Sequence, residues 1–218
     1  MKKILFSDID GTLVNGDQPI SSKDQEAIKK LREKGHYFSF CTGRNIQETK
    51  IITPYFEYDY LVLNNGAMIV DQQDQVLYRK QIKNEIAKEI LNESMKKYPY
   101  LNYTFFDGKQ TYGFINEKTC KLTNEGYQEI EGNFLDILNN TTEDIDIVCA
   151  FHPEEKLDEI KEIQQQINQK YTGIHATLNV VYLDITVDCT KGTGLQKLCS
   201  LFKEDVTSYC IGDSFNDL

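Results

Sequence analysis

The chain has 218 residues, enough for one large domain or for a core domain with a second, smaller one. Its composition, with 40% hydrophobic residues, is that of a globular protein, and its formal net charge of −10 opposes binding to the phosphate backbone of DNA or RNA. The N-terminus lacks an apolar run long enough for a signal peptide or a membrane span, so we expect a cytoplasmic protein without nucleic-acid or membrane partners.

The first third of the chain alternates between strand and helix patterns. Strands are predicted at 3–7, 36–41 and 60–63, and helices from Ser22 to Gly35 and over 45–53. Strand, helix, strand, helix, strand is the order of a parallel sheet with helical crossovers. The sequence therefore predicts an α/β fold with a Rossmann-like parallel sheet.

The middle of the chain follows a different pattern. Short extended runs on either side of 71–74 predict a hairpin, and a helix follows at 84–98. Further on, the patterns predict a hairpin of 103–106 and 111–115, a helix near 119–130, a strand at 145–151, a helix over 154–171, and paired strands at 174–178 and 180–187. We interpret 83–186, which carries most of the negative charge, as an inserted α+β domain. The parallel-sheet domain would consist of 1–82 and 187–218, resuming with a helix at 194–202 and a strand at 206–211.

The ends of the predicted parallel strands collect polar residues. In an open parallel sheet, ligands bind beyond the carboxyl ends of the strands. The residues expected there are Asp8, Asp10, Gly11 and Thr12 after the first strand, Thr42 and Gly43 after the second, Asn65 and Gly66 after the third, Asp213, Asn216 and Asp217 after the last, and Lys191 before the last helix. Asp8 and Asp10, two residues apart, are expected to share one pocket, where their repulsion calls for a hard divalent cation such as Mg²⁺.

Four motifs resemble those of the haloacid dehalogenase superfamily and occur in the same order. They are Asp8-Ile9-Asp10-Gly11-Thr12-Leu13, Thr42-Gly43-Arg44, Lys191-Gly192, and Gly212-Asp213-Ser214-Phe215-Asn216-Asp217. The large insert, together with Asn64-Asn65-Gly66-Ala67, resembles the Cof-like type IIB subclass with a type-2 cap domain. The resemblance covers essentially the whole chain. Relatives continue beyond the fourth motif, so we expect this chain, which ends at Leu218, to be truncated.

The resemblance implies a Mg²⁺-dependent phosphatase of small phosphorylated metabolites. Asp8 would attack phosphorus and become an aspartyl phosphate, and Asp10 would protonate the leaving oxygen and then take a proton from water. The metal would be held by Asp8 and Asp213, with Asp217 nearby as an outer or water-mediated ligand and the backbone carbonyl of Asp10 in contact. The substrate phosphate would be bound by Asp8, Gly11, Thr42, Gly43, Asn65, Lys191 and Asn216, among which Thr42 and Lys191 would also be catalytic.

Taken singly, these residues have simpler interpretations. Asp8 to Gly11 could form a solvated turn, Thr42 could cap a helix, and Lys191 could be a surface lysine. Their joint occurrence at successive strand ends favours a site. The acidic insert argues against a polyanionic substrate and favours a sugar phosphate or similar monoester. Two alternatives stay open: a phosphomutase on the same scaffold, and a truncated remnant that binds its ligand without turnover.

Overall fold

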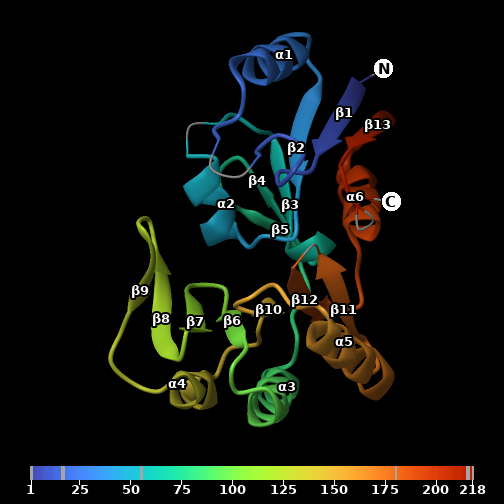
Figure 1. Cartoon of the computed structure of the whole chain (residues 1–218). Coiled ribbons are helices and arrows are strands. Elements are labelled where there is room, and N and C mark those ends of the chain that lie inside the picture. The colour runs from blue at the N-terminus through green and yellow to red at the C-terminus, as the bar shows by residue number, and fades with distance from the viewer. Residues whose placement is uncertain (1, 16–17, 55, 180, 215–216, 218) are drawn as a thin grey trace. The chain divides into compact units, whose positions relative to one another are not determined.

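The computed structural model describes all residues except 1, 16–17, 55, 180, 215–216 and 218 (Figure 1). The chain divides into two units, which we call the core unit, Met1–Arg79 with Cys189–Leu218, and the insert unit, Lys80–Asp188. The insert unit is slightly longer at both ends than the predicted insert at 83–186, and its assignment as a cap stays a prediction. None of the helices that the structure describes has the length and apolarity needed to cross a membrane.

The core unit is built on a six-stranded sheet with the order β13-β1-β2-β3-β4-β5. Its strands are β1 (Lys2–Ser7), β2 (Tyr37–Cys41), β3 (Tyr60–Leu63), β4 (Met68–Asp71), β5 (Val76–Arg79) and β13 (Val206–Ile211). Neighbouring strands from β13 to β3 pair in parallel, whereas β4 and β5 are antiparallel additions at one edge. The predicted parallel sheet is therefore confirmed.

Helices cover both faces of the core sheet (Figure 1). Ile28 of α1 (Ser22–Glu33) and Ile46 of α2 (Ile46–Ile52) pack on one face with apolar side chains such as Phe38. Leu198 of α6 (Lys191–Leu201) packs on the opposite face with side chains such as Phe6. Strands that are buried on both faces consist mostly of apolar residues, and the charged residues of the core sheet lie at the strand ends.

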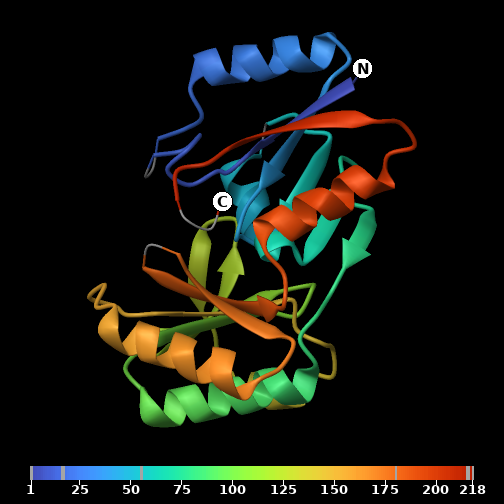
Figure 2. The same cartoon turned by 90° about the vertical axis from the view of Figure 1, so that its right-hand side faces the viewer.

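The insert unit has its own antiparallel sheet of seven strands, with the order β11-β12-β10-β6-β7-β8-β9. The strands are β6 (Asn102–Phe106), β7 (Thr111–Ile115), β8 (Lys118–Thr123), β9 (Gly126–Glu129), β10 (Ile147–Phe151), β11 (Ile174–Asn179) and β12 (Tyr182–Val187). Helices α3 (Asn84–Lys97), α4 (Phe134–Asn140) and α5 (Asp158–Lys170) pack on one apolar face. Figure 2 shows α3 and α5 side by side, where Lys97 pairs with Glu162 at 2.7 Å.

The structure corrects several predicted elements. The helix predicted near 119–130 is wrong, because this segment forms the hairpin of β8 and β9. Cys120 and Leu122 are buried in the alternating pattern of a strand, and Gly126 takes a φ of +96° at the turn. Helix α4 was not predicted. Helix α5 begins at Asp158, after the predicted start, whereas α6 begins at Lys191, before it.

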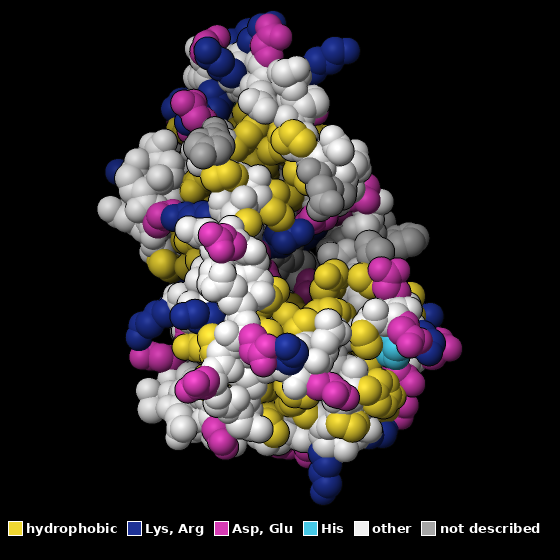
Figure 3. All heavy atoms as spheres, turned by 60° about the vertical axis from the view of Figure 1, so that its left-hand side comes forward, with side chains coloured by type: hydrophobic (Ala, Val, Ile, Leu, Met, Phe, Trp, Pro, Cys, Tyr) yellow, Lys and Arg dark blue, Asp and Glu magenta, His cyan; other side chains and the backbone are white. Residues whose placement is uncertain are grey.

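The surface charge is mixed on the face shown in Figure 3, where acidic and basic side chains lie interspersed. The excess of Asp and Glu over Lys and Arg, 34 against 24, is therefore not gathered into one patch on this face. Nucleic-acid binding normally needs a continuous basic surface. The described side chains visible there form no such surface.

Candidate active site

Strand β1 places Asp8 at the carboxyl edge of the core sheet. The backbone N–H of Asp8 donates to the carbonyl oxygen of Ile211 at 3.0 Å, so the ladder between β1 and β13 continues to this residue. Asp213 follows Ile211 by two positions. Because β1 and β13 are parallel neighbours, their exit loops lie side by side and bring the two acidic residues together. The Asp8 residue itself is only 5% exposed.

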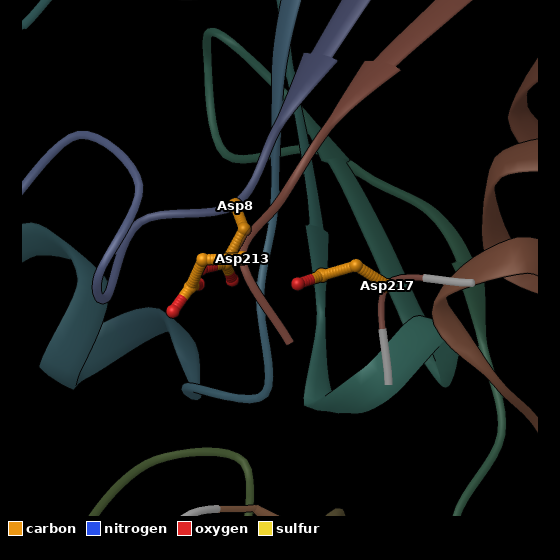
Figure 4. Close-up of side chains that lie close together, drawn as sticks. All are labelled: Asp8, Asp213 and Asp217. Carbon is orange, nitrogen blue, oxygen red and sulfur yellow. The ribbon is translucent and has the colours of Figure 1, made fainter. Parts of the chain in front are cut away.

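Three carboxylates meet at this edge, and we call them the carboxylate cluster: Asp8, Asp213 and Asp217. One oxygen of each lies within 4.8 Å of the oxygens of the other two. Figure 4 shows Asp217 pointing towards Asp8 and Asp213 from the opposite side. Neighbouring groups hold the cluster in place, since Thr12 Oγ1 donates to Asp213 at 3.2 Å and the backbone N–H of Ser214 donates to Asp217 at 3.1 Å.

Lys191 joins two members of the cluster. Its Nζ lies 2.7 Å from Oδ1 of Asp8 and 2.7 Å from Oδ1 of Asp217. The residue is the first of α6, where Thr190 and Thr193 form a reciprocal cap: Thr193 N–H donates to Thr190 Oγ1, and Thr190 N–H donates to Thr193 Oγ1. This cap fixes the start of the helix and therefore the position of Lys191.

A pair of glycines lets α6 approach the loop after β3. Gly66 belongs to the short turn η1 (Asn64–Gly66) and takes a φ of +98°. A Cβ atom added to Gly194 would lie 2.5 Å from Gly66 Cα, and one added to Gly66 would lie 2.2 Å from the carbonyl oxygen of Thr190. Only glycines fit at this contact, which brings the N-terminus of α6 to the same sheet edge as Asn65.

The charges in the site do not balance. Burial raises the pKa of the Asp8 carboxyl, and the Lys191 ammonium counters this rise only in part because it is shared with Asp217. Burial also disfavours the ammonium of Lys191, but the carboxylates of Asp8 and Asp217 outweigh that effect and raise its pKa. Lys191 therefore stays protonated, and three carboxylates around one ammonium leave an excess of negative charge.

This donor set fits a hard divalent cation. Carboxylate oxygens are the ligands that Mg²⁺ and Ca²⁺ take in proteins, and the uncompensated charge favours a cation at this point. Asp8, Asp213 and Asp217 are the described residues that could hold it.

Asp10 lies outside the carboxylate cluster. Its two oxygens accept hydrogen bonds from Arg44, from Nε at 2.8 Å and from Nη2 at 2.8 Å. The sequence placed Asp8 and Asp10 in one pocket, but their side chains have different partners. Arg44 offers Asp10 a matching pair of donors, and Gly11, with a φ of +81°, turns the chain directly after it. A ligand role for Asp10 stays a prediction and would use its backbone carbonyl.

The predicted phosphate-binding residues lie at the ends of β2 and β3. Thr42 and Asn65 are both nearly fully buried, and the backbone N–H of Asn65 donates to the carbonyl oxygen of Thr42 at 3.1 Å. Gly43 follows Thr42 directly. The backbone N–H of Asp217 donates to Ser214 at 3.1 Å, which closes the last loop. Asn216, the remaining candidate, lies outside the described residues.

The family model of the haloacid dehalogenase-like hydrolases matches residues 5–218. The chain belongs to this family.

Named relatives agree with that assignment. The chain is 24% identical to the HMP-PP phosphatase of Klebsiella pneumoniae, covering 100% of this chain and 79% of the relative. It is 25% identical to the glucosyl-3-phosphoglycerate/mannosyl-3-phosphoglycerate phosphatase of Methanococcoides burtonii, covering 100% of this chain and 80% of that relative. Among solved structures, the haloacid dehalogenase subclass IIB sugar phosphatase BT4131 superimposes with a TM-score of 0.72 at 22% identity. The match covers 99% of this chain and 82% of that structure's chain. The predicted fold and the predicted class of enzyme, a Cof-like phosphatase, are confirmed.

Some site features of this haloacid dehalogenase-like hydrolase were missed by the sequence reasoning. Arg44 and Thr12 were part of the quoted motifs but received no role, although they bind Asp10 and Asp213. The contact between Gly66 and Gly194 was also missed. A signal was present, because glycines at a strand exit and in the first turn of a helix often mark a close backbone approach.

Proposed function

We propose that this hydrolase removes phosphate from small phosphomonoesters, sugar phosphates in particular, in a Mg²⁺-dependent reaction through an aspartyl phosphate on Asp8. The observation that supports it most is the buried carboxylate of Asp8, held at 2.7 Å by Lys191 and grouped with Asp213 and Asp217. The names of the relatives, which include a sugar phosphatase and two phosphatases of other phosphorylated metabolites, favour this substrate class. The insert unit would act as the cap.

The carboxylate cluster would hold the metal ion. Bound there, Mg²⁺ would neutralise the excess negative charge and reduce the repulsion between Asp8 and an incoming phosphate. Two unit charges of like sign about 4 Å apart repel by roughly 4 kcal/mol at an effective dielectric constant near 20. That repulsion would slow attack by Asp8 by roughly 10³-fold when no cation compensates it.

Asp8 would be the nucleophile. Lys191 binds one carboxylate oxygen, which orients the other towards phosphorus and stabilises charge on the transferring group. Attack forms a bond between the Asp8 oxygen and phosphorus, and the bond from phosphorus to the substrate oxygen breaks. Asp10 gives a proton to that leaving oxygen. Thr42 and Asn65 would bind the phosphoryl oxygens during the transfer.

Hydrolysis of the intermediate would regenerate the enzyme. Asp10, now a carboxylate, takes a proton from water while the water oxygen attacks phosphorus. The bond between phosphorus and the Asp8 oxygen breaks, and inorganic phosphate leaves.

The test measures phosphate release from a panel of sugar phosphates, with Mg²⁺ or with a chelator, for three proteins. The wild type should turn over at least one ester, and only when the metal is present. The turnover rate of Asp8→Asn should be lower by roughly 10³-fold or more. Asp205→Asn, which changes an exposed residue, should match the wild type. Full turnover by Asp8→Asn would contradict the proposal. Free alcohol released in equal amount to phosphate would separate hydrolysis from transfer to another sugar hydroxyl.

Metal binding is tested without turnover. Mg²⁺ at about 100 times its Kd should stabilise the folded protein by roughly 2.7 kcal/mol and raise its Tm. The same rise is expected for Asp205→Asn and should be absent for Asp213→Asn. An equal rise in all three proteins would place the cation elsewhere.

A further inference from the structure

The contact between Arg44 and Asp10 has the geometry of a fork. Nε and Nη2 of Arg44 each donate to a different oxygen of Asp10, both at 2.8 Å. The side chains are 34% and 46% exposed, so the pair contributes little to stability. The pair instead orients the Asp10 carboxylate, because a planar guanidinium that binds both oxygens fixes the plane of that group.

The backbone of Arg44 is held on both sides. Its N–H donates to Thr42 Oγ1 at 3.2 Å, and its carbonyl oxygen accepts from the N–H of Asn64 at 3.1 Å. Arg44 is therefore anchored to the exit loops of β2 and β3, which carry the candidate phosphate-binding residues Thr42 and Asn65. A side chain that starts from this anchored point can orient Asp10 in the exit loop of β1.

The loop that carries Asp10 leaves its side chain in need of such support. Asp10 is followed by Gly11, whose N–H donates to the carbonyl oxygen of Val14 at 2.8 Å in a tight turn. This bond fixes the backbone of the turn. It does not select the rotamer of the half-exposed Asp10 side chain, whereas the two bonds from Arg44 do.

We propose that Arg44 is a positioning residue that aims the carboxyl group of Asp10 at the leaving oxygen, an inference that rests on the proposed function. A carboxyl group has about four lone-pair sites, and Arg44 uses one on each oxygen. One oxygen can thus carry the transferred proton while the other still accepts from Arg44. In the first step the proton passes from Asp10 to the ester oxygen as its bond to phosphorus breaks, which leaves Asp10 as a carboxylate. Arg44 itself exchanges no proton.

The dependence of the rate on the leaving group tests this role. The alkoxide of an alkyl phosphate needs a proton to leave, whereas the nitrophenolate of p-nitrophenyl phosphate does not. We compare kcat/KM, which reports the first phosphoryl transfer, for both esters. Arg44→Gln should lower kcat/KM by roughly 10- to 100-fold for the alkyl ester and by less than about threefold for the aryl ester. Arg44→Lys, which keeps the charge but not the fork, should fall in between.

Two further variants make the test specific. Asp10→Asn should show the same selective loss, and the double variant should be no slower on the alkyl ester than Asp10→Asn alone, because both changes remove one function. Arg32→Gln is the matched control. Arg32 makes the same fork to Asp59, with bonds of 3.1 and 3.2 Å, and is outside the candidate site. The ratio of kcat/KM for the two esters should be the same in Arg32→Gln as in the wild type.

The outcomes separate the inference from the function on which it rests. Equal losses on both esters in Arg44→Gln, as expected if Arg44 binds the substrate phosphate directly or if the fold is damaged, would overturn the inference alone. Additive losses in the double variant would do the same. A wild type that hydrolyses neither these two esters nor any sugar phosphate of the panel would overturn the proposed function and this inference with it.

Discussion

The ammonium group of Lys191 lies 2.7 Å from a carboxylate oxygen of Asp8, although 183 residues separate the two in sequence and both side chains are at most 6% exposed. A buried ion pair of this kind adds little net stability compared with an apolar pair, but removal of one partner leaves an unpaired buried charge. Here Lys191 also serves Asp217. Its loss would leave both Asp8 and Asp217 without the ammonium that pairs with them.

Lys191→Met should therefore lower the free energy of unfolding by roughly 3 kcal/mol when no divalent cation is present. Urea denaturation with a chelator measures this change. Lys197→Met is the control, because it removes the same charge from the same helix at a position where the lysine lies over the Tyr78 ring. We expect less than about 1 kcal/mol there. Similar losses in both variants would show that the charge of the helix matters, not the ion pair.

The contact of α6 with η1 gives a prediction about stability alone. Gly194→Ala would place a methyl group 2.5 Å from Gly66 Cα and 2.8 Å from Val62 Cγ1, so helix and turn must separate. We expect a loss of about 1–3 kcal/mol. Gly192→Ala adds the same methyl group to the same helical turn, where the nearest atom is Thr190 Oγ1 at 3.6 Å. This control should be neutral or slightly stabilising, because alanine favours helix over glycine. Equal denaturation midpoints for the two variants would contradict the contact.

The thiol of Cys41 makes stability depend on pH. Burial raises the pKa of Cys41 to about 12, from the ordinary value of 9.0. Between these values the folded protein keeps a proton that the unfolded chain releases, so stability is complete below about pH 9 and falls as the pH rises towards 12. From pH 9.5 to 10.5 the wild type should lose roughly 1.4 kcal/mol more than Cys41→Ala. Denaturation at both pH values measures this difference, and equal slopes would show that Cys41 ionises freely in the folded state.

Much of the core unit follows from local sequence pattern. Apolar runs that end in Asp8, in Thr42 and in Asn64-Asn65 could be assigned to buried strands, because strands covered on both faces are mostly apolar and keep charged residues at their ends. Parallel pairing then places those ends on one edge. This is why the residues of the carboxylate cluster could be named from the sequence, although they come from both ends of the chain.

The remaining features depend on contacts between distant segments. Residues 118–129 became the hairpin of β8 and β9 because β8 pairs with β7, and pairing of this kind is not visible in the composition of the segment. Whether the Asp10 side chain binds a metal or Arg44 depends on how the exit loops of β1 and β2 face each other. No periodicity predicts the distance between such loops.

A substitution at Gly11 tests whether the turn after Asp10 keeps the proposed metal site in shape. Gly11→Ala forces an L side chain into a φ of +81°, and its Cβ would lie 2.3 Å from Oδ2 of Asp213. Gly35→Ala creates the same strain at a φ of +77°, with no atom within 4 Å of the new Cβ. Both variants should lose about 1–2 kcal/mol of stability through backbone strain. Only Gly11→Ala should also displace Asp213, so its affinity for Mg²⁺ should fall by roughly 10-fold or more, measured by the rise of Tm during a Mg²⁺ titration. If Gly11→Ala binds Mg²⁺ as tightly as Gly35→Ala does, Asp213 either moves without consequence or does not hold the metal.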